Sequence, residues 1–381
     1  MDDLIRAGVE ARKKRQKKNR IMKRAAIVAA SLLLVIFIAV VAGSIALAWM
    51  KSSGRGTLLK GASNQAPSLA LTETESAGAD QPAQKPLEEG YVRYNGKVYR
   101  YNEDIINILC LGVDNKGEVE QKDEIGLAGQ ADTLFLLSMD TRNKTMKLIS
   151  INRDTMTDIA VYDFFGNYVS NATAQLALAY SYGDGAAKSC ELTVEAVSNL
   201  LYQLPIHAYC SINMDAIPVI NDMVGGVEVT INDDFSKVSK RMKQGETITL
   251  KGGEALIFVR SRMDVGNGTN EERMARQKQY MLSFVSSAKA AMKKDLTFPI
   301  KLFNGISEYL VTDISLNEIT YLATQALESE FTSDSMLNIQ GTSQMGERYM
   351  EFYVDDEALY DLIIDVFYEE DSSYEEDNSH E

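Results

Sequence analysis

Charged side chains border four apolar runs of this sequence, at points where strands would begin or end. They are Asp114, Asp132, Arg153, Asp154, Arg260 and Arg262. In α/β sheets, ligands commonly bind at strand ends. Carboxylates suit Mg²⁺, a hard ion that prefers oxygen ligands, and arginines bind phosphate oxygens through paired hydrogen bonds. Together these residues predict a pyrophosphate bound with Mg²⁺.

The spacing of Arg260 and Arg262 is a sharper signal than any single residue. In an extended segment, a spacing of two places both guanidinium groups on one face. Two like charges side by side repel each other unless an anion lies between them. Taken singly, an Asp after a strand is commonly a turn or cap residue, and an Arg belongs to a surface ion pair. The pattern as a whole therefore indicates the anion site.

The elements that must position these residues are short apolar runs interleaved with helical segments. Residues 91–101 alternate around Asn95-Gly96, which predicts a hairpin with a type I′ turn. Further strands are expected at residues 105–111, 133–139, 146–151, 208–212 and 227–231. Helices are expected at residues 172–182, 186–202, 214–224, 251–257 and 271–293. After residue 333 we expect a strand pair, 335–339 with 349–353, and a helix at 355–367. The interleaving predicts an α/β fold, a mixed central sheet with helices on both faces.

Charge is strongly divided along the 381 residues. Residues 1–24 hold ten Lys or Arg against three acids, a net charge of +7 that leaves −22 for the rest of the chain. Residues 25–50 carry no charge, and as a helix rising about 1.5 Å per residue they are long enough for a hydrocarbon core of about 30 Å. The basic cluster before this run predicts a cytoplasmic N-terminus that touches anionic lipid, with everything after Lys51 outside the cell.

A cleaved signal peptide is the alternative for this segment, because residues 46–48 have the form Ala-x-Ala. The apolar run exceeds a signal-peptide core of about 7–15 residues, which favours an uncleaved anchor in the cell membrane. The predicted organisation follows: a cytoplasmic basic segment 1–24, a transmembrane helix 25–50, an extracellular linker 51–88, a catalytic domain 89–333, a C-terminal extension 334–368 packed on it, and an acidic tail 369–381. The linker is rich in small and polar residues, and the tail is expected to be solvated.

Composition excludes several classes of protein. The only histidines are His207 and His380, which excludes zinc sites built on several His. The three cysteines, Cys110, Cys190 and Cys210, form no CxxC motif, and a single disulfide among them stays open. Residues 183–189 approach a phosphate loop, but Ala187 replaces the Gly that must precede the Lys. A bulk nucleic-acid binder would not confine its positive charge to residues 1–24, so no nucleic-acid partner is expected.

In these motifs the chain resembles the LytR-CpsA-Psr family, bacterial enzymes that attach anionic glycopolymers to the cell wall. The resemblance covers roughly residues 105–290 and rests on seven pieces in order. They are the basic and then apolar start, and segments 107–114, 131–134, 150–155, 223–229, 258–262 and 273–277. No single piece is specific, but their order is.

The resemblance implies a phosphotransferase. It would move a polymer such as a teichoic acid or capsule precursor from undecaprenyl pyrophosphate to a peptidoglycan hydroxyl, as a phosphodiester. By this likeness Asp114 and Asp132 would hold Mg²⁺ against the pyrophosphate. Arg153, Arg260, Arg262 and Arg273 would bind its oxygens, and Gln277 would assist. Phosphoryl transfer needs in-line positioning and charge neutralisation more than covalent help, and Asp154 is a candidate base or orienting group.

The sequence departs from the family pattern at three points. Gln130 stands where the family often has a basic residue, Asn270 replaces an Asp for which Glu271 or Glu272 could compensate, and Ala177 replaces an Asn. Two other classes stay open: a polyprenyl-pyrophosphate phosphohydrolase with water as acceptor, and a non-enzymatic surface or regulatory binding module. The joint presence of Asp114 and Asp132 argues against a simple binder.

Overall fold

The computed structural model describes residues 48, 50–59, 65–69, 87–163 and 165–373. Contacts divide the chain into two units, residues 1–53 and 54–381, and the second contains the sheet and the candidate site. The membrane helix predicted at 25–50 lies outside the described residues apart from residues 48 and 50. Within the described part of the chain, no helix has both the length and the apolar character needed to span a bilayer.

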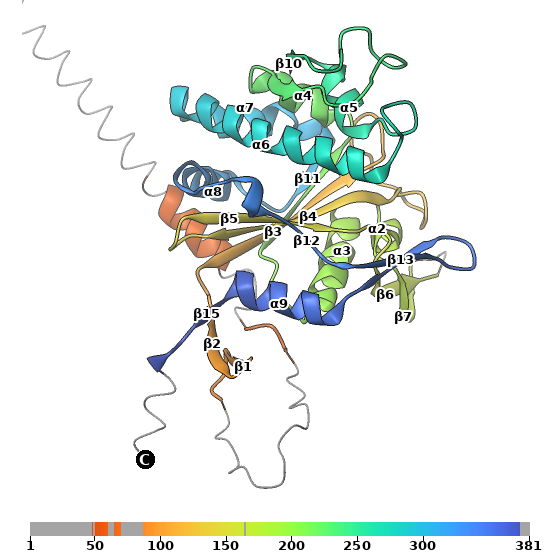
Figure 1. Cartoon of the computed structure of the whole chain (residues 1–381). Coiled ribbons are helices and arrows are strands. Elements are labelled where there is room, and N and C mark those ends of the chain that lie inside the picture. The colour runs from red at the N-terminus through yellow and green to blue at the C-terminus, as the bar shows by residue number, and fades with distance from the viewer. Residues whose placement is uncertain (1–47, 49, 60–64, 70–86, 164, 374–381) are drawn as a thin grey trace, which may run out of the picture. The chain divides into compact units, whose positions relative to one another are not determined.

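A six-stranded mixed sheet forms the centre of the fold, with the order β11-β8-β3-β4-β5-β12 (Figure 1). Its strands are β3 (Ile105–Val113), β4 (Ala131–Asp140), β5 (Thr145–Ile151), β8 (Ala208–Asn213), β11 (Leu310–Thr312) and β12 (Met336–Asn338). The β3–β4, β4–β5 and β8–β11 pairs are antiparallel, whereas β3–β8 and β5–β12 are parallel. The mixed sheet predicted from the interleaved runs is confirmed.

Alternation along β3 explains why helices cover both faces of the sheet. Leu109 and Leu111 pack in the largest core cluster, together with residues of α3 and α9, whereas Ile106 and Ile108 pack with Leu58 and α8 on the other side. Successive side chains of a strand point to opposite faces, so a strand buried on both faces is largely apolar along its length. Figure 1 shows α3 and α9 on one side of the sheet and α6 and α8 on the other.

Most helices lie where the sequence predicts them, but the prediction differs near residue 175 and lacks the helices at 298–305 and 316–328. They are α2 (Ala177–Ser181), α3 (Ala187–Leu200), α4 (Ala216–Met223), α5 (Gly253–Arg260), α6 (Asn270–Lys294), α7 (Phe298–Gly305), α8 (Leu316–Glu328) and α9 (Asp356–Phe367). The helix expected at 172–182 is wrong in its first part. Residues 172–175 end β7 (Tyr168–Gln175), which pairs with β6 (Met156–Tyr162) in an exposed hairpin. Pairing with the neighbouring strand outweighs the helical preference of the alanines.

Besides the β6–β7 hairpin, three smaller sheets complete the fold. One sheet contains β1 (Tyr91–Tyr94), β2 (Lys97–Tyr101) and β15 (Tyr368–Glu370). The second pairs β9 (Val227–Thr230) with β10 (Thr247–Leu250), and the third pairs β13 (Gly341–Met345) with β14 (Met350–Val354). The β1–β2 hairpin is confirmed, with Asn95 and Gly96 at positive φ. The expected pairing of 335–339 with 349–353 is wrong. β12 joins the central sheet beside β5, and β14 pairs with β13, whose exposed residues carry no apolar signal.

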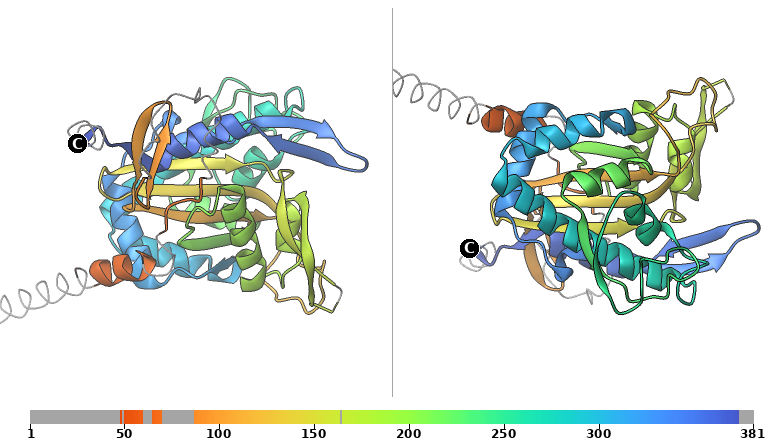
Figure 2. Two further views of the ribbon diagram at one scale, coloured as in Figure 1. Left: turned by 90° about the horizontal axis from the view of Figure 1, so that it is seen from below. Right: turned by 90° about the horizontal axis from the view of Figure 1, so that it is seen from above.

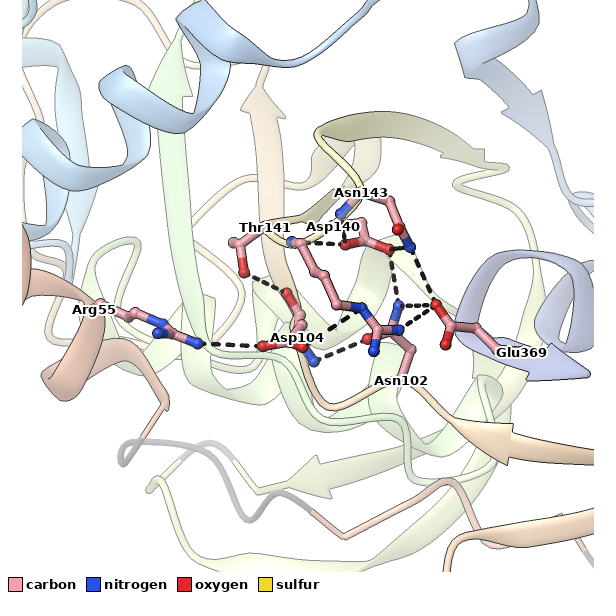
Figure 3. Close-up of polar contacts among 8 residues, drawn as sticks. Arg55, Asn102, Asp104, Asp140, Thr141, Asn143 and Glu369 are labelled. Carbon is pink, nitrogen blue, oxygen red and sulfur yellow. Dashed lines mark hydrogen bonds and ion pairs between the residues drawn. The ribbon is translucent and has the colours of Figure 1, made fainter. Parts of the chain in front are cut away.

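The C-terminal strand β15 is held by a polar cluster at the end of the sheet where β3 starts and β4 ends (Figure 3). The carboxylate of Glu369 forms an ion pair with Arg142 and accepts hydrogen bonds from the side-chain amides of Asn102 (3.2 Å) and Asn143 (3.1 Å). Arg55 forms an ion pair with Asp104 at 3.2 Å in the same cluster. Glu369 and Glu370 therefore belong to a strand, in contrast to the solvated tail expected from residue 369.

Replacing Phe367 tests whether the last helix is part of the core. Phe367 is fully buried at the end of α9, so Phe367→Ala should lower the free energy of unfolding by about 3–5 kcal/mol. Phe165, which is 90 % exposed, provides a matched control, because Phe165→Ala removes the same atoms from a solvated position. Guanidinium titration followed by circular dichroism measures both. Equal midpoints for the two variants would show that α9 does not stabilise the domain.

Candidate active site

Three strands of the central sheet bring the predicted acidic and basic residues to one end. Asp114 follows β3, Asp132 is the second residue of β4, and Arg153 and Asp154 follow β5. The register pairs Val113 with Ala131 and Leu134 with Ile151. The end of β3, the start of β4 and the end of β5 therefore lie at the same end of the sheet. Strand alternation and hairpin register are sufficient to assemble this part of the site.

Arg153 lies at the centre of the acidic groups. Its guanidinium forms an ion pair with Asp132, donates to Oε1 of Gln130 at 3.0 Å, and approaches Oδ1 of Asp154 at 3.4 Å. The Arg153 side chain is 37 % exposed, so part of it remains open to a ligand. The family's usual basic residue is absent at position 130. Gln130 instead accepts a hydrogen bond from Arg153 and helps to fix its orientation.

Arg260 reaches the same region from a helix. It is the last residue of α5, and its Nη2 donates to both carboxylate oxygens of Asp114, at 2.9 and 3.0 Å. The extended conformation assumed for residues 260–262 is therefore wrong at Arg260. Residues 253–260 form a helix because Ala255 and Phe258, three positions apart, are both buried. The ring of Phe258 stacks on Phe235, with centroids 5.7 Å apart.

Several guanidinium groups gather around Arg273 on α6. Burial lowers the pKa of Arg273, and the positive charges of Arg262, Arg276 and Arg153 lower it further, against the opposing effect of Asp132. Each of these groups is therefore close enough to act on Arg273. Arg262 itself is exposed. Cations held together in a partly buried site are mutually repulsive, and a bound anion would relieve that repulsion.

Two neighbouring residues of α6 hold the end of α5 in place. Arg276 is 3 % exposed, forms an ion pair with Asp233, and donates to the carbonyl oxygens of Phe258 and Ser261. Gln277 donates through Nε2 to the carbonyl oxygen of Val259 at 3.1 Å. Both are positioning residues for Arg260 and Arg262. Sequence reasoning did not single out Arg276, although its spacing of three from Arg273 on a helix indicates a shared face.

Asp114 and Asp132 are the residues of this site that could hold Mg²⁺. Burial raises the pKa of Asp132, Arg153 opposes this, and the charge of Asp114 raises it again. Asp114 and Asp132 lie near one another because the residues that precede them, Val113 and Ala131, are paired across β3 and β4. In the part of the chain that the structure describes, no three or more His, Cys, Asp or Glu come together as a metal-binding group. Two carboxylates suffice for Mg²⁺, which commonly takes its remaining ligands from waters and substrate phosphates.

The remaining predicted features have structural roles. His207 is buried, its Nδ1 accepts a hydrogen bond from the backbone N–H of Asn107 at 3.0 Å, and burial lowers its pKa to about 4. His207 is therefore a structural residue of the core. All three cysteines are free. The Glu272 carboxylate accepts from the backbone and side chain of Asn267, at 2.9 and 2.7 Å, and the side chains of Asn270 and Glu271 lie outside the described set.

The fold and site define a class: an α/β domain with arginines and carboxylates clustered at the ends of its central strands. Residues 68–363 match the LytR_cpsA_psr family model. The chain therefore belongs to the LytR_cpsA_psr family, as the resemblance predicted.

Relatives with curated names are similar over most of this domain. The chain is 34 % identical over 248 residues to polyisoprenyl-teichoic acid–peptidoglycan teichoic acid transferase TagV of Bacillus subtilis, covering 62 % of this chain and 56 % of that protein. It is 28 % identical over 260 residues to TagU of Enterococcus faecalis, covering 68 % and 77 %. The match thus spans little more than half the length of the TagV relative. The crystal structure of B. subtilis TagV superposes with a TM-score of 0.53 and 28 % identity, covering 69 % of this chain and 96 % of that one.

Proposed function

We propose that this chain is a membrane-anchored phosphotransferase. It moves an anionic glycopolymer of the teichoic acid class from an undecaprenyl-pyrophosphate carrier to peptidoglycan, as a phosphodiester. One observation carries the proposal: at the strand ends Arg153 forms an ion pair with Asp132 and Arg260 with Asp114, and the charges of Arg260 and Arg273 also act on Asp132. A pyrophosphate offers these guanidinium groups the oxygens that they are shaped to bind. The names of the TagV and TagU relatives support the same reaction class.

The reaction exchanges one phosphate ester for another. The oxygen of a peptidoglycan hydroxyl attacks the phosphorus that carries the glycopolymer, forming a new P–O bond. The bond from that phosphorus to the bridging oxygen breaks, and undecaprenyl phosphate leaves with the oxygen. The arginines hold the pyrophosphate oxygens in line and offset the charge that develops there. Such positioning supplies most of the catalysis in phosphoryl transfer.

Asp154 is the proposed acceptor of the proton of the attacking hydroxyl. Its Oδ1 accepts from Nε2 of Gln175 at 3.0 Å and lies 3.4 Å from Nε of Arg153. Among the described residues, no donor is bonded to its Oδ2. Gln175 and Arg153 therefore orient the carboxylate, and one oxygen remains to receive the proton.

Asp114 and Asp132 are the proposed Mg²⁺ ligands. Mg²⁺ held there would offset the negative charge of the pyrophosphate oxygens. Arg153 and Arg260 each contact one of the two carboxylates, so the same guanidinium groups keep both carboxylates in place.

The proposal includes the N-terminal anchor. A basic cytoplasmic segment 1–24, a membrane helix 25–50 and a linker 51–88 would keep the domain outside the cell but close to the bilayer. This placement suits a substrate whose isoprenoid tail stays in the membrane.

The rate of transfer should fall at mildly acidic pH. Because burial raises the pKa of Asp132 above the ordinary Asp value of about 4, its carboxylate is protonated at a higher pH than that of an exposed Asp. The carboxylate form is the one that pairs with Arg153 and holds Mg²⁺. As pH falls through this raised pKa, kcat/KM should drop about tenfold per pH unit. A pH–rate profile measures this fall of kcat/KM at acidic pH. A value of kcat/KM that stays constant down to pH 4 would contradict the role of Asp132.

The full-length chain in detergent tests the proposed function. It would be incubated with a polyprenyl-pyrophosphate-linked teichoic acid oligomer and a peptidoglycan fragment, with Mg²⁺ or with EDTA. Mass spectrometry should detect the joined product only with Mg²⁺. Tight donor binding without any turnover would instead indicate a binding module.

A further inference from the structure

Exposed apolar side chains gather on two hairpins at the catalytic end of the sheet. On β13–β14 they are Met345, Tyr349, Met350 and Tyr353, with exposed fractions of 68, 66, 44 and 42 %. On β6–β7 they are Phe165, Tyr168 and Val169. Both views of Figure 2 show the two hairpins projecting from the same side of the domain. Clustered exposed apolar groups commonly mark a binding surface.

The β13–β14 hairpin is tied directly to the candidate base. The backbone N–H of Phe352 donates to the carbonyl oxygen of Asp154 at 2.9 Å, and Thr155 bridges to Phe352 in parallel. Nε2 of Gln175 donates both to the Asp154 carboxylate at 3.0 Å and to the carbonyl oxygen of Met350 at 2.7 Å. The position of the hairpin is therefore fixed relative to the Asp154 carboxylate.

One face of the hairpin combines aromatic rings with hydrogen-bonding groups. Alternation along β14 places Glu351 and Tyr353 on the same face, and their cross-strand partners are Gln344 and Thr342. Tyr349 directly precedes β14, and its carbonyl oxygen accepts from the backbone N–H of Gly346 at 2.9 Å, which continues the pairing by one position and puts Tyr349 on this face. The Tyr353 hydroxyl donates to Oε2 of Glu351 at 2.9 Å, which fixes both side chains.

The other face of the hairpin has a different role. Phe352, on that face, is 8 % exposed and anchors the hairpin to the domain. Met345 and Met350 lie directly opposite one another on the same face. The two faces can therefore be tested separately.

We propose that the Tyr349–Tyr353 face of this hairpin binds the glycan strand of the acceptor. This inference rests on the proposed function and assigns the acceptor subsite of the same reaction. Tyrosine rings offer flat, rigid contact area at low entropic cost, which suits the apolar faces of sugar rings. The neighbouring amide, hydroxyl and carboxylate groups can hydrogen-bond sugar hydroxyls.

The charge of the hairpin favours an uncharged sugar chain over a polyanionic donor or an anionic lipid surface as its partner. Residues 341–354 contain Glu347, Arg348 and Glu351, a net charge of −1. A polyanionic donor or an anionic lipid surface would gain nothing from this charge, since both are attracted by clustered Lys and Arg. An uncharged sugar chain is not repelled by it. The glycan part of peptidoglycan is the partner that matches both the rings and the charge.

The test compares variants on the two faces of the hairpin. Binding of a β-1,4-linked N-acetylglucosamine hexamer to the full-length chain would be measured by calorimetry, and acceptor KM and kcat by the coupling reaction. Tyr349→Ala and Tyr353→Ala should each weaken hexamer binding by roughly tenfold and raise the acceptor KM more than they lower kcat. Tyr353→Phe keeps the ring and should retain most of the affinity. Met345→Ala, on the opposite face, should leave the affinity unchanged.

Four other results would contradict the assignment of the acceptor subsite. They also distinguish a failure of that assignment from a failure of the proposed function. Unchanged hexamer affinity in the two tyrosine variants, with coupling by the parent chain intact, would place the acceptor elsewhere. Equal losses in Met345→Ala and Tyr353→Ala would remove the face specificity. If the two tyrosine variants lost binding to phosphatidylglycerol vesicles but kept binding to the hexamer, the hairpin would be a membrane-binding surface. Absence of coupling by the parent chain would count against the transferase itself.

Discussion

Replacing Arg153 by Lys should lower the rate of transfer by about 10²- to 10³-fold, with the charge of the site unchanged. Arg153 contacts Asp132, Gln130 and Asp154 through separate nitrogens of one planar group. Lys offers a single point charge, which cannot keep these contacts and bind a phosphate as a fork. Loss of one fixed donor to the developing negative charge commonly costs this much.

Arg142 provides the matched control for this substitution. Arg142 also forms an ion pair with a carboxylate, that of Glu369, but at the opposite end of β4 and β5. Arg142→Lys should therefore leave kcat/KM for transfer close to that of the parent chain. Initial rates of lipid phosphate release at saturating acceptor measure both variants. Equal rates for Arg153→Lys and the parent chain would remove Arg153 from the reaction.

The substitution Asp132→Asn should lower the rate of transfer by about 10³-fold and should weaken binding of the divalent cation. The amide keeps the size of the side chain but removes the charge that pairs with Arg153 and balances Arg273. Asp132 is 27 % exposed, so the variant should still fold, with a change in unfolding free energy of about 1 kcal/mol.

Cation binding provides a readout of Asp132 that does not depend on turnover. Mn²⁺, as a stand-in for Mg²⁺, can be titrated into the chain and followed by electron paramagnetic resonance. The parent chain should bind one ion, and Asp132→Asn should bind it at least tenfold more weakly. The same Mn²⁺ affinity in both chains would show that Asp132 is not a metal ligand, whatever its effect on rate.

The strand ends of the site could be predicted from the sequence because local signals are strong there. Runs of apolar residues mark β3, β4 and β5, and a charged residue follows or begins each of them. Antiparallel pairing of consecutive strands then brings Asp114, Asp132 and Arg153 together, with no information needed from distant parts of the chain.

The remaining parts depend on tertiary contacts that no local pattern encodes. Arg260 ends a helix because Phe258 packs against Phe235, and the sequence around it reads equally well as a strand. Arg276 positions the loop after that helix from a buried site on α6, whereas an Arg in a polar helix normally indicates solvent exposure. β13 is exposed along its whole length, so its pairing with β14 leaves no hydrophobic alternation to detect.

The acceptor in the reaction decides between transfer and hydrolysis, and isotopic labelling identifies it directly. The full-length chain, Mg²⁺, the lipid-linked teichoic acid oligomer and a peptidoglycan fragment would react in H₂¹⁸O, and mass spectrometry would locate the label. Transfer to a sugar hydroxyl predicts a joined phosphodiester without ¹⁸O and one equivalent of unlabelled undecaprenyl phosphate. A free polymer phosphate that carries one ¹⁸O, with no joined product, would show that water is the acceptor and would contradict the phosphotransferase assignment.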